Sequence, residues 1–190
     1  MLHKIAKICQ TLLIILLCIY GLCLIWFPNT VHAEERLSGT PRVIDGDTIE
    51  LAGEKIRLAC VDTPESNYRG KTQYCLDNET DCGKLAKEAL QKMIGTHDIT
   101  CYYTKRDVYG RILGHCFEYK WAHSFNYVGP GTYNYALVEQ GFAWFYKGGK
   151  ECEVYKPAFK EAKKEGYGLF NEEIGGFKEP KLWRKTRSND

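Results

Sequence analysis

The sequence predicts an α+β protein, mainly β, in which an OB-type barrel of five strands is capped by about three helices. Short alternating apolar segments lie between residues 42 and 118, turn-forming residues separate them, and amphipathic helical segments are inserted late in the chain. Short strands with late helices are typical of a small closed β-barrel, in which the strand edges are paired.

The strands are expected at 42–52 and 55–62 and in a hairpin at 98–118. In the second segment Ile56, Leu58 and Cys60 alternate with the residues of the opposite face.

Three segments have the pattern of helices. Residues 84–95 repeat apolar residues at helical spacing and end on a glycine, so one face of this helix is expected to pack on the core. A short helix is expected near 133–141, and another from Pro157 to Gly166, because proline is favoured at the first helical position.

The N-terminus has the layout of a secretory signal peptide. Residues 12–27 are apolar, Lys4 and Lys7 precede them, and the sequence VHA follows at 31–33, so cleavage is expected after Ala33. The apolar run is long for a signal peptide and short for a membrane span, which leaves an uncleaved N-terminal anchor as the alternative. The remaining chain divides into a polar lead-in at 34–41, one domain at 42–170 and a basic tail at 171–190.

Bulk charge identifies no partner. The first 33 residues hold two lysines and no acidic residue, so the rest has 24 basic and 24 acidic side chains. A polyanion would have to be attracted by local clusters of positive charge.

Six cysteines lie outside the leader, and their pattern favours disulfides in an exported protein. They form no C-x-x-C pair, and the histidines have no zinc-binding spacing. If the hairpin turn is centred on Val108 and Tyr109, Cys101 lies opposite Cys116, within disulfide reach. Cys75 and Cys82 are expected to close the polar loop between them. Cys60 and Cys152 remain unassigned, and Cys60 is alternatively a small buried side chain.

The stretch VIDGDTIEL at residues 43–51 allows two interpretations. Asp45-Gly46 is a common turn signal because glycine accepts a positive φ. Asp47, however, shares a strand face with Ile49 and Leu51. A carboxylate on an apolar face needs a partner, so this turn is also a candidate cation site.

Two further stretches have ordinary interpretations when taken alone. In RLACVDTPES, residues 57–66, Asp62 ends a strand because Thr63-Pro64 leads the chain out of it. DVYGR, residues 107–111, is a tight hairpin turn followed by an arginine.

Together these stretches resemble the staphylococcal nuclease (thermonuclease) family. The likeness continues through NYALVEQGFAWFY at 134–146 and AKKEGYGLF at 162–170, and it covers about residues 40–170. The resemblance implies a Ca²⁺-dependent nuclease that cleaves the 5′ P–O bond of DNA and RNA and leaves 3′-phosphates. The expected partner is nucleic acid, with single strands favoured, and the expected state is a monomer.

The resemblance also assigns roles to residues of this chain. The calcium ligands would be Asp47, Asp62 and the backbone carbonyl of Thr63, with Asp45 near the ion. Glu65 would be the general base, and Arg57 and Arg111 would hold the phosphate. Tyr109 would contact phosphate, and Tyr146 would stack on a base. For Tyr146 a buried aromatic is the alternative. Val108 departs from the family, which commonly has a basic residue at this position.

The proposed chemistry requires these residue types. Calcium takes oxygen ligands in loose geometry, and because it acidifies bound water less than zinc does, a carboxylate base is needed nearby. Guanidinium groups match the charge that gathers on the phosphoryl oxygens. A catalytically silent module that binds nucleic acid or protein is the alternative function, but it would not need Arg57, Glu65 and Arg111 beside two aspartates. A single-strand binding protein of the OB type would be expected to carry more positive charge.

Overall fold

The computed structural model describes residue 10 and residues 12–18, 35–121 and 128–187. The chain forms two compact units, Met1–Ala33 and Glu34–Asp190. In the first unit residue 10 and residues 12–18 are helical, while the expected cleavage point after Ala33 lies outside the described residues. Within the described ranges, no helix combines the length and the apolar character needed to cross a membrane.

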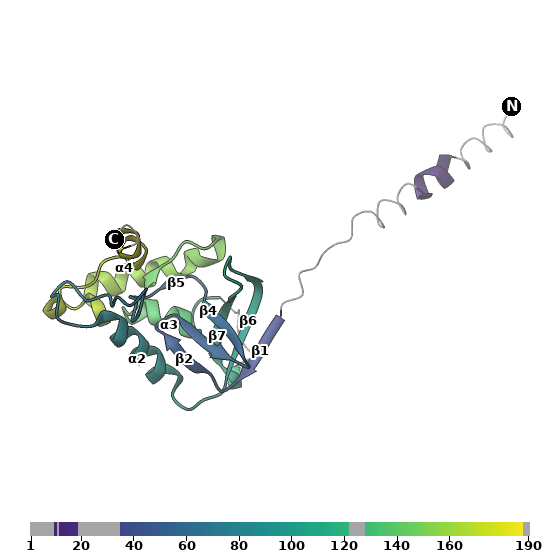
Figure 1. The fold of residues 1–190 in the computed structure, drawn as a ribbon. Helices are drawn as coiled ribbons and strands as arrows, with labels where there is room; N and C mark the ends of the chain where they lie inside the picture. Colours follow the sequence, from purple (N-terminus) through teal and green to yellow (C-terminus); the bar gives the residue numbers. More distant parts are fainter. Residues whose placement is uncertain (1–9, 11, 19–34, 122–127, 188–190) are drawn as a thin grey trace. The chain divides into compact units, whose positions relative to one another are not determined.

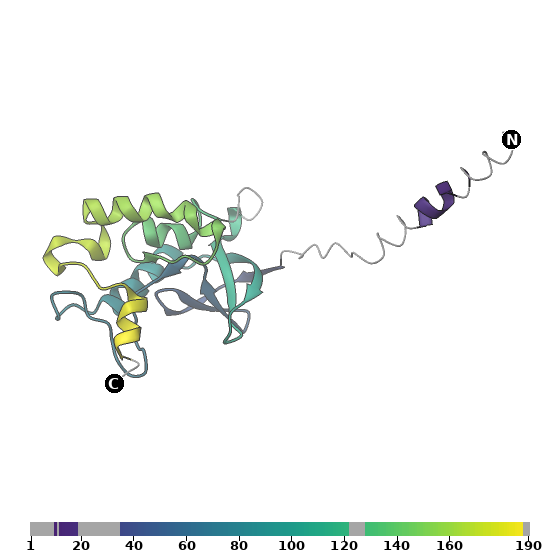
Figure 2. The ribbon, with the colours of Figure 1, turned by 90° about the horizontal axis from the view of Figure 1, so that it is seen from above.

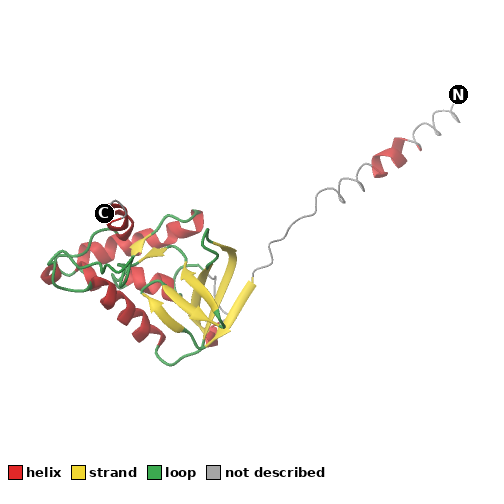
Figure 3. Cartoon of the chain, viewed as in Figure 1, coloured by secondary structure: helices red, strands yellow, loops and turns green. Residues whose placement is uncertain are grey.

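The second unit is a mixed α+β domain, and the helices lie along the curved sheet (Figure 1 and Figure 3). The strands are β1 (Glu35–Gly39), β2 (Arg42–Asp45), β3 (Thr48–Leu51), β4 (Glu54–Leu58), β5 (Val61–Asp62), β6 (Ile99–Arg106), β7 (Ile112–Glu118) and β8 (Trp144–Phe145). The α-helices are α2 (Cys82–Ile94), α3 (Tyr133–Glu139), α4 (Lys156–Glu165) and α5 (Pro180–Arg187). Short 3₁₀ turns are η1 (Tyr119–Trp121), η2 (Lys150–Tyr155), η3 (Gly168–Phe170) and η4 (Glu172–Ile174).

Six strands form one sheet in the order β1-β6-β7-β4-β3-β2, and β5 and β8 form a separate antiparallel pair. All neighbours in the large sheet are antiparallel except β4 and β7. The sheet curls, so that β1 at one edge also approaches β3, which lies next to the strand at the opposite edge. This curled half-barrel with helices confirms the predicted OB-type α+β class, although the residues expected as a polar lead-in supply the edge strand β1.

The core fills the inside of this curl. Alternate residues of β3 and β4 are buried there, and Ile49 and Ile56 are fully excluded from solvent. Helix α2 packs against β2, and α3 packs against β7 and α4. The three predicted helices are therefore present, with bounds close to those expected.

Asn134 lies in the first turn of α3, which follows the N-cap residue Thr132, and it connects this helix to two strands by hydrogen bonds. The fully buried Asn134 accepts a hydrogen bond from the Cys116 amide at 2.9 Å and donates to the carbonyls of Ala59 and Gly114, each at 2.9 Å. These contacts fix the end of β4 against β7, which is the region that leads into the candidate site.

The disulfides fasten three separate regions. Cys101 and Cys116 are bonded across the β6–β7 hairpin with Cα atoms 4.1 Å apart, and Cys75 is bonded to Cys82 at the start of α2. Both pairings confirm the expectation. The third bond joins Cys60 to Cys152, so Cys60 is not merely a small core residue.

The C-terminal residues, expected only as a basic tail, contain a helix that packs on the domain. In α5 the side chains of Pro180 and Trp183 are buried, and Phe177 just before it is 4% exposed. In Figure 2 this helix runs beside the loop that precedes α2.

Candidate active site

The Asp45-Gly46-Asp47 turn joins β2 to β3 and packs tightly against its surroundings. Gly46 does not adopt a positive φ, which corrects the expected reason for this glycine. The requirement is steric, because a Cβ on Gly46 would lie 2.7 Å from Thr63 Oγ1 and 2.9 Å from the Cβ of Ala86 on α2. Glycine thus lets the turn lie against the segment that carries the other acidic residues.

Asp47 is 4% exposed and points into the domain, as its place on the apolar face of β3 predicts. Its Oδ2 accepts from Arg57 Nη1 at 2.7 Å and from the Thr63 amide at 3.4 Å. The other oxygen, Oδ1, accepts from the Thr48 hydroxyl at 2.9 Å. The burial of this charge is therefore compensated by an ion pair and hydrogen bonds.

Arg57 links the two aspartates. It lies on β4, opposite Thr48 of β3, and its Nη2 donates to Asp62 Oδ1 at 2.7 Å while Nη1 holds Asp47. Asp62 is 1% exposed at the end of the short strand β5. One guanidinium thus holds two buried carboxylates against each other.

Glu65 follows Asp62 on the loop that leads to α2. The backbone of Glu65 lies against α2 so closely that a Cβ on Gly83 would be 2.2 Å from the Glu65 carbonyl oxygen. The same carbonyl accepts a hydrogen bond from the backbone amide of Gln73 at 2.9 Å. Glycine at the first turn of α2 is what permits this position of the loop.

A second arginine, from α5, completes the network. Arg184 Nη2 donates to both oxygens of Asp62, at 2.9 and 2.8 Å, and Nη1 donates to Glu65 Oε1 at 2.5 Å. Sequence reasoning missed this residue because residues 171–190, which include WRKTR, were interpreted only as a basic tail. The available signal was the spacing of Pro180 and Trp183, which places two apolar side chains on one face of a short helix.

Burial, together with the charge of Asp47, raises the pKa of three acidic side chains of the cluster, Glu65, Asp45 and Asp62. Burial is the main cause for Glu65, whose pKa rises to about 6, with the negative charge of Asp47 as the second cause. Burial likewise raises the pKa of Asp45, and Asp47 adds to it. For Asp62, burial raises the pKa, while hydrogen bonding by Arg184 opposes the shift. Removal of these carboxylates from water thus disfavours their charged forms, and the charge of Asp47 adds to the effect.

This donor set fits a hard cation such as Ca²⁺. Carboxylate oxygens of Asp47 and Asp62 converge on one guanidinium, and Thr63, which follows Asp62 in the chain, donates its backbone amide to Asp47. In the described part of the chain, no three acidic, histidine or cysteine side chains already form a metal-binding group, and Arg57 and Arg184 are paired with the carboxylates.

Two of the expected site residues lie apart from this network. Arg111 is bound to Asp107 within its own turn, through Nε at 2.8 Å and Nη2 at 2.7 Å. Burial raises the pKa of Asp107, but the hydrogen bonds from Arg111 outweigh it and the net shift is downward. Tyr109 is 82% exposed at the turn, with the Arg111 guanidinium 5.6 Å from its ring centre. Arg111 does precede β7, whose Ile112 pairs with Ile56, the neighbour of Arg57.

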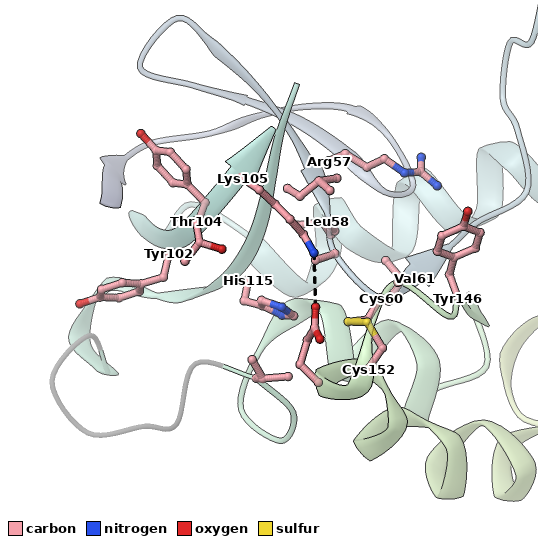
Figure 4. A pocket seen from close by; sticks show the side chains of 16 residues that line it. Arg57, Leu58, Cys60, Val61, Tyr102, Thr104, Lys105, His115, Tyr146 and Cys152 are labelled. Carbon is pink, nitrogen blue, oxygen red and sulfur yellow. Dashed lines mark hydrogen bonds and ion pairs between the residues drawn. A yellow bond between two sulfur atoms is a disulfide. The ribbon is translucent and has the colours of Figure 1, made fainter. Parts of the chain in front are cut away.

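A cavity of about 240 Å³ opens beside Arg57. Arg57 and Tyr146 lie on one side of it and Tyr102 on the other (Figure 4). Lys105 and Glu151 form an ion pair at 3.4 Å across it. Burial lowers the pKa of the lining His115 to about 4, so this side chain is neutral at pH 7. Tyr146, expected to stack on a base, is therefore on the cavity wall and 38% exposed.

The chain is similar to known proteins over most of the domain. A family model described as staphylococcal nuclease homologue matches residues 55–172. An uncharacterized endonuclease of Escherichia coli is 29% identical over 136 residues, which cover 69% of this chain and 74% of the relative. Protein ParB of Escherichia coli is 29% identical over 154 residues, 78% of each chain.

The succinoglycan biosynthesis protein ExoI of Rhizobium meliloti is 43% identical over 90 residues. That match covers 45% of this chain and 44% of the relative, so the chain spans less than half of that protein. The family match includes Arg57, Asp62, Glu65 and Arg111, whereas Arg184 lies beyond it. Because the model matches more than half of the chain, the protein belongs to the staphylococcal nuclease family.

Proposed function

We propose that the protein is an exported Ca²⁺-dependent nuclease that hydrolyses phosphodiester bonds of DNA and RNA with little sequence specificity. The observation that carries the proposal is the single ion-pair network of Asp47, Arg57, Asp62 and Glu65, which come from separate segments. A protein that only bound nucleic acid would not need a carboxylate base beside this pair of aspartates.

The residues divide the chemistry among them. Asp47, Asp62 and the Thr63 carbonyl would hold the cation, with Asp45 near it, and the cation would supply positive charge for the phosphate. Glu65, whose pKa of about 6 suits a base near neutral pH, takes the proton of the attacking water. Arg57 offers its guanidinium to the negative oxygens of the phosphoryl group. Cleavage of the 5′ P–O bond leaves a 3′-phosphate.

Arg111 serves in this proposal as a second phosphate contact after leaving Asp107. Its pairing with Asp107 within a turn keeps it close to β4 and needs only a side-chain rotation to be released. Tyr109 would contact phosphate at the same turn, and Tyr146 would hold a base over the cavity beside Arg57.

Export is supported by the three disulfides, since such bonds persist in oxidising compartments. Calcium outside cells would also fill a site too weak for cytosolic calcium concentrations. An N-terminal membrane anchor would place the same domain in the same kind of environment. The domain would act as a monomer on single strands.

Digestion of single-stranded DNA tests the proposal. The purified chain should degrade the DNA with added calcium and stop when a chelator is added, and the fragments should carry 3′-phosphates by mass spectrometry. Cleavage that persists in chelator would contradict the calcium dependence. Binding of the DNA without any cleavage would identify the protein as a catalytically silent module.

A further inference from the structure

The helix α5 contributes a side chain to the acidic cluster from outside the segment that matches the family. Arg184 reaches across 119 residues of sequence to Glu65 and across 122 to Asp62. Its side chain is 21% exposed, and those of Glu65 and Asp62 are 15% and 2% exposed. Such shielded pairs differ from exposed surface ion pairs, which stabilise proteins little.

Apolar contacts hold α5 in place independently of Arg184. Trp183 is 7% exposed and meets the ring of Tyr68 edge-on, with ring centres 6.2 Å apart. Phe177 stacks on Phe170 with ring centres 5.0 Å apart. These contacts position the helix, so its attachment does not require the guanidinium.

The C-terminal segment also braces the loop that carries Glu65. The side-chain Nε2 of Gln73 donates to the Lys178 carbonyl at 2.8 Å, while the backbone amide of Gln73 donates to the Glu65 carbonyl. The Leu76 amide donates to the Gly176 carbonyl at 2.9 Å. The loop from 65 to 76 and the C-terminal segment therefore form one hydrogen-bonded unit.

We propose that Arg184 is a positioning residue of the nuclease site, which fixes the Asp62 and Glu65 carboxylates relative to each other from outside the matched family domain. The inference rests on the proposed function. The planar guanidinium holds Asp62 through Nη2 and Glu65 through Nη1, and its contact with Glu65 uses Oε1. In the described network Oε2 is left as the oxygen that can accept a proton from water.

The charges of the cluster explain why a second arginine is needed to hold Glu65 in place. Asp47, Asp62 and Glu65 repel one another, and the ion pairs that Arg57 makes within the described part of the chain go to the two aspartates. Without a second cation Glu65 would turn away from Asp62 toward solvent. Because the base must be placed within fractions of an ångström, such a displacement costs rate rather than substrate affinity.

Variants of the full chain test this role. Arg184→Ala should lower kcat on single-stranded DNA on the order of 10²-fold, with KM nearly unchanged. Arg184→Lys, which keeps the charge but loses the fork, should recover part of the loss. Millimolar guanidinium should partly restore Arg184→Ala. Leu182→Ala, at an exposed position of the same helix, is the matched control and should behave as the unchanged protein.

A readout independent of activity separates this proposal from the proposed function. Hydrogen exchange of residues 65–73 should become faster in Arg184→Ala and stay unchanged in Leu182→Ala, while thermal unfolding reports the fold of each. Unchanged exchange, or a kcat equal to or above that of the unchanged protein, would overturn the positioning role. Absence of cleavage in the unchanged protein would refute the proposed function, and exchange would still decide the role of Arg184.

A second inference comes from a different part of the surface, a groove of about 420 Å³ between the β8 region, α4 and the start of α5. Four lysines and four aromatic residues line it together with one carboxylate: Lys147, Lys156, Lys160, Lys181, Trp144, Phe145, Tyr146, Phe159 and Glu179. The four lysines are exposed. The groove thus combines an excess of positive charge with aromatic rings.

This groove and the cavity beside Arg57 share one lining residue. Tyr146 lines both, and the Lys181 ammonium lies 5.5 Å from the centre of its ring. Lys163 lies in the same way over Trp144, at 5.1 Å. A chain that leaves the active site past Tyr146 would enter the lysine-lined groove.

We infer that the groove binds the single-stranded part of a nucleic acid next to the cleaved bond, which also rests on the proposed function. Lysines would neutralise backbone phosphates, and the aromatic rings would accept stacked bases of any sequence. Lys181 comes from beyond residue 172, where the family match ends. The C-terminal segment would therefore contribute to substrate binding as well as to the carboxylate cluster.

Binding to the groove is tested by the fluorescence anisotropy of a labelled oligonucleotide, measured in the presence of a chelator that stops cleavage. The triple variant Lys147→Ala, Lys160→Ala, Lys181→Ala should bind a strand of about twelve nucleotides at least roughly tenfold more weakly, with a salt slope lower by about 2. Alanine at Lys84, Lys87 and Lys92 of α2 is the matched control.

Equal affinity of the groove and control variants would overturn the inference. Cleavage of a dinucleotide, which is too short to reach the groove, should be the same in both triple variants. A loss of dinucleotide cleavage in the groove variant would also overturn it, because it would place these lysines in the catalytic site. Failure of every protein to cleave would refute the proposed function alone.

Discussion

Substitution of Asn134 by alanine should destabilise the domain strongly, although Asn134 touches no residue of the acidic cluster. The amide group makes three hydrogen bonds of 2.9 Å inside the protein. The Gly114 carbonyl would keep a second partner, the Ala59 amide, but the Cys116 amide and the Ala59 carbonyl would be left buried without this bond. At about 1–3 kcal/mol for each of the two orphaned groups, the expected loss is about 2–6 kcal/mol.

Urea unfolding of the purified domain, followed by tryptophan fluorescence, measures this loss. Asn134→Asp should be no better than alanine, because a carboxylate cannot donate to the two carbonyls and faces them with a negative charge. Asn67→Ala is the control, since this exposed residue only accepts from the Gly70 amide, and it should cost no more than about 0.5 kcal/mol. A loss below about 1 kcal/mol for Asn134→Ala would refute the reasoning.

Three further outcomes follow from the structure. Without added metal, the raised pKa of Glu65 contributes stability below pH 4.5 that is lost as pH rises through about 6. The difference in unfolding free energy between the unchanged protein and Glu65→Gln should therefore change by about 2 kcal/mol between these pH values. A difference that stays constant with pH would contradict the raised pKa. Gly83→Ala should reduce cleavage while leaving α2 helical by circular dichroism, because its Cβ would displace the Glu65 backbone, and full activity would argue against that contact. Removal of the Cys60–Cys152 bond by serine at both positions should cost about 4 kcal/mol in chemical unfolding, and an unchanged midpoint would show that this bond does not constrain the unfolded chain.

The sequence predicted those parts of the fold that depend on local pattern. Alternation in β3 and β4 and the amphipathic spacing of α2 locate the core, and Cys101 lies opposite Cys116 as expected. Near the turn, however, Arg106 pairs with Ile112, which centres the turn on Tyr109, and a bulge between Tyr103 and Lys105 restores the register of the two cysteines. Alternation alone does not reveal this bulge.

Long-range features were less accessible. The pairing of Cys60 with Cys152 joins residues 92 apart in sequence and depends on how η2 packs on the barrel. β1 appears polar in sequence because it is an edge strand with one solvated face.

For the candidate site, the sequence motifs identified Asp47, Arg57, Asp62 and Glu65, and the structure brings these side chains into one ion-pair network. Arg184 was not predictable from motif spacing, since its contact with the cluster depends on the path of the whole C-terminal segment. Trp183 was the best signal for that path, because a large apolar side chain in a charged segment needs a place to be buried.

Single-turnover cleavage of single-stranded DNA by Glu65→Gln at saturating calcium tests the central claim most directly. If Glu65 is the base in a carboxylate cluster built for phosphodiester hydrolysis, the rate should fall on the order of 10²–10⁴-fold while DNA binding and the thermal midpoint are retained. A rate equal to that of the unchanged protein would contradict the account, because the network of Asp47, Arg57, Asp62 and Glu65 would then not be the catalytic centre.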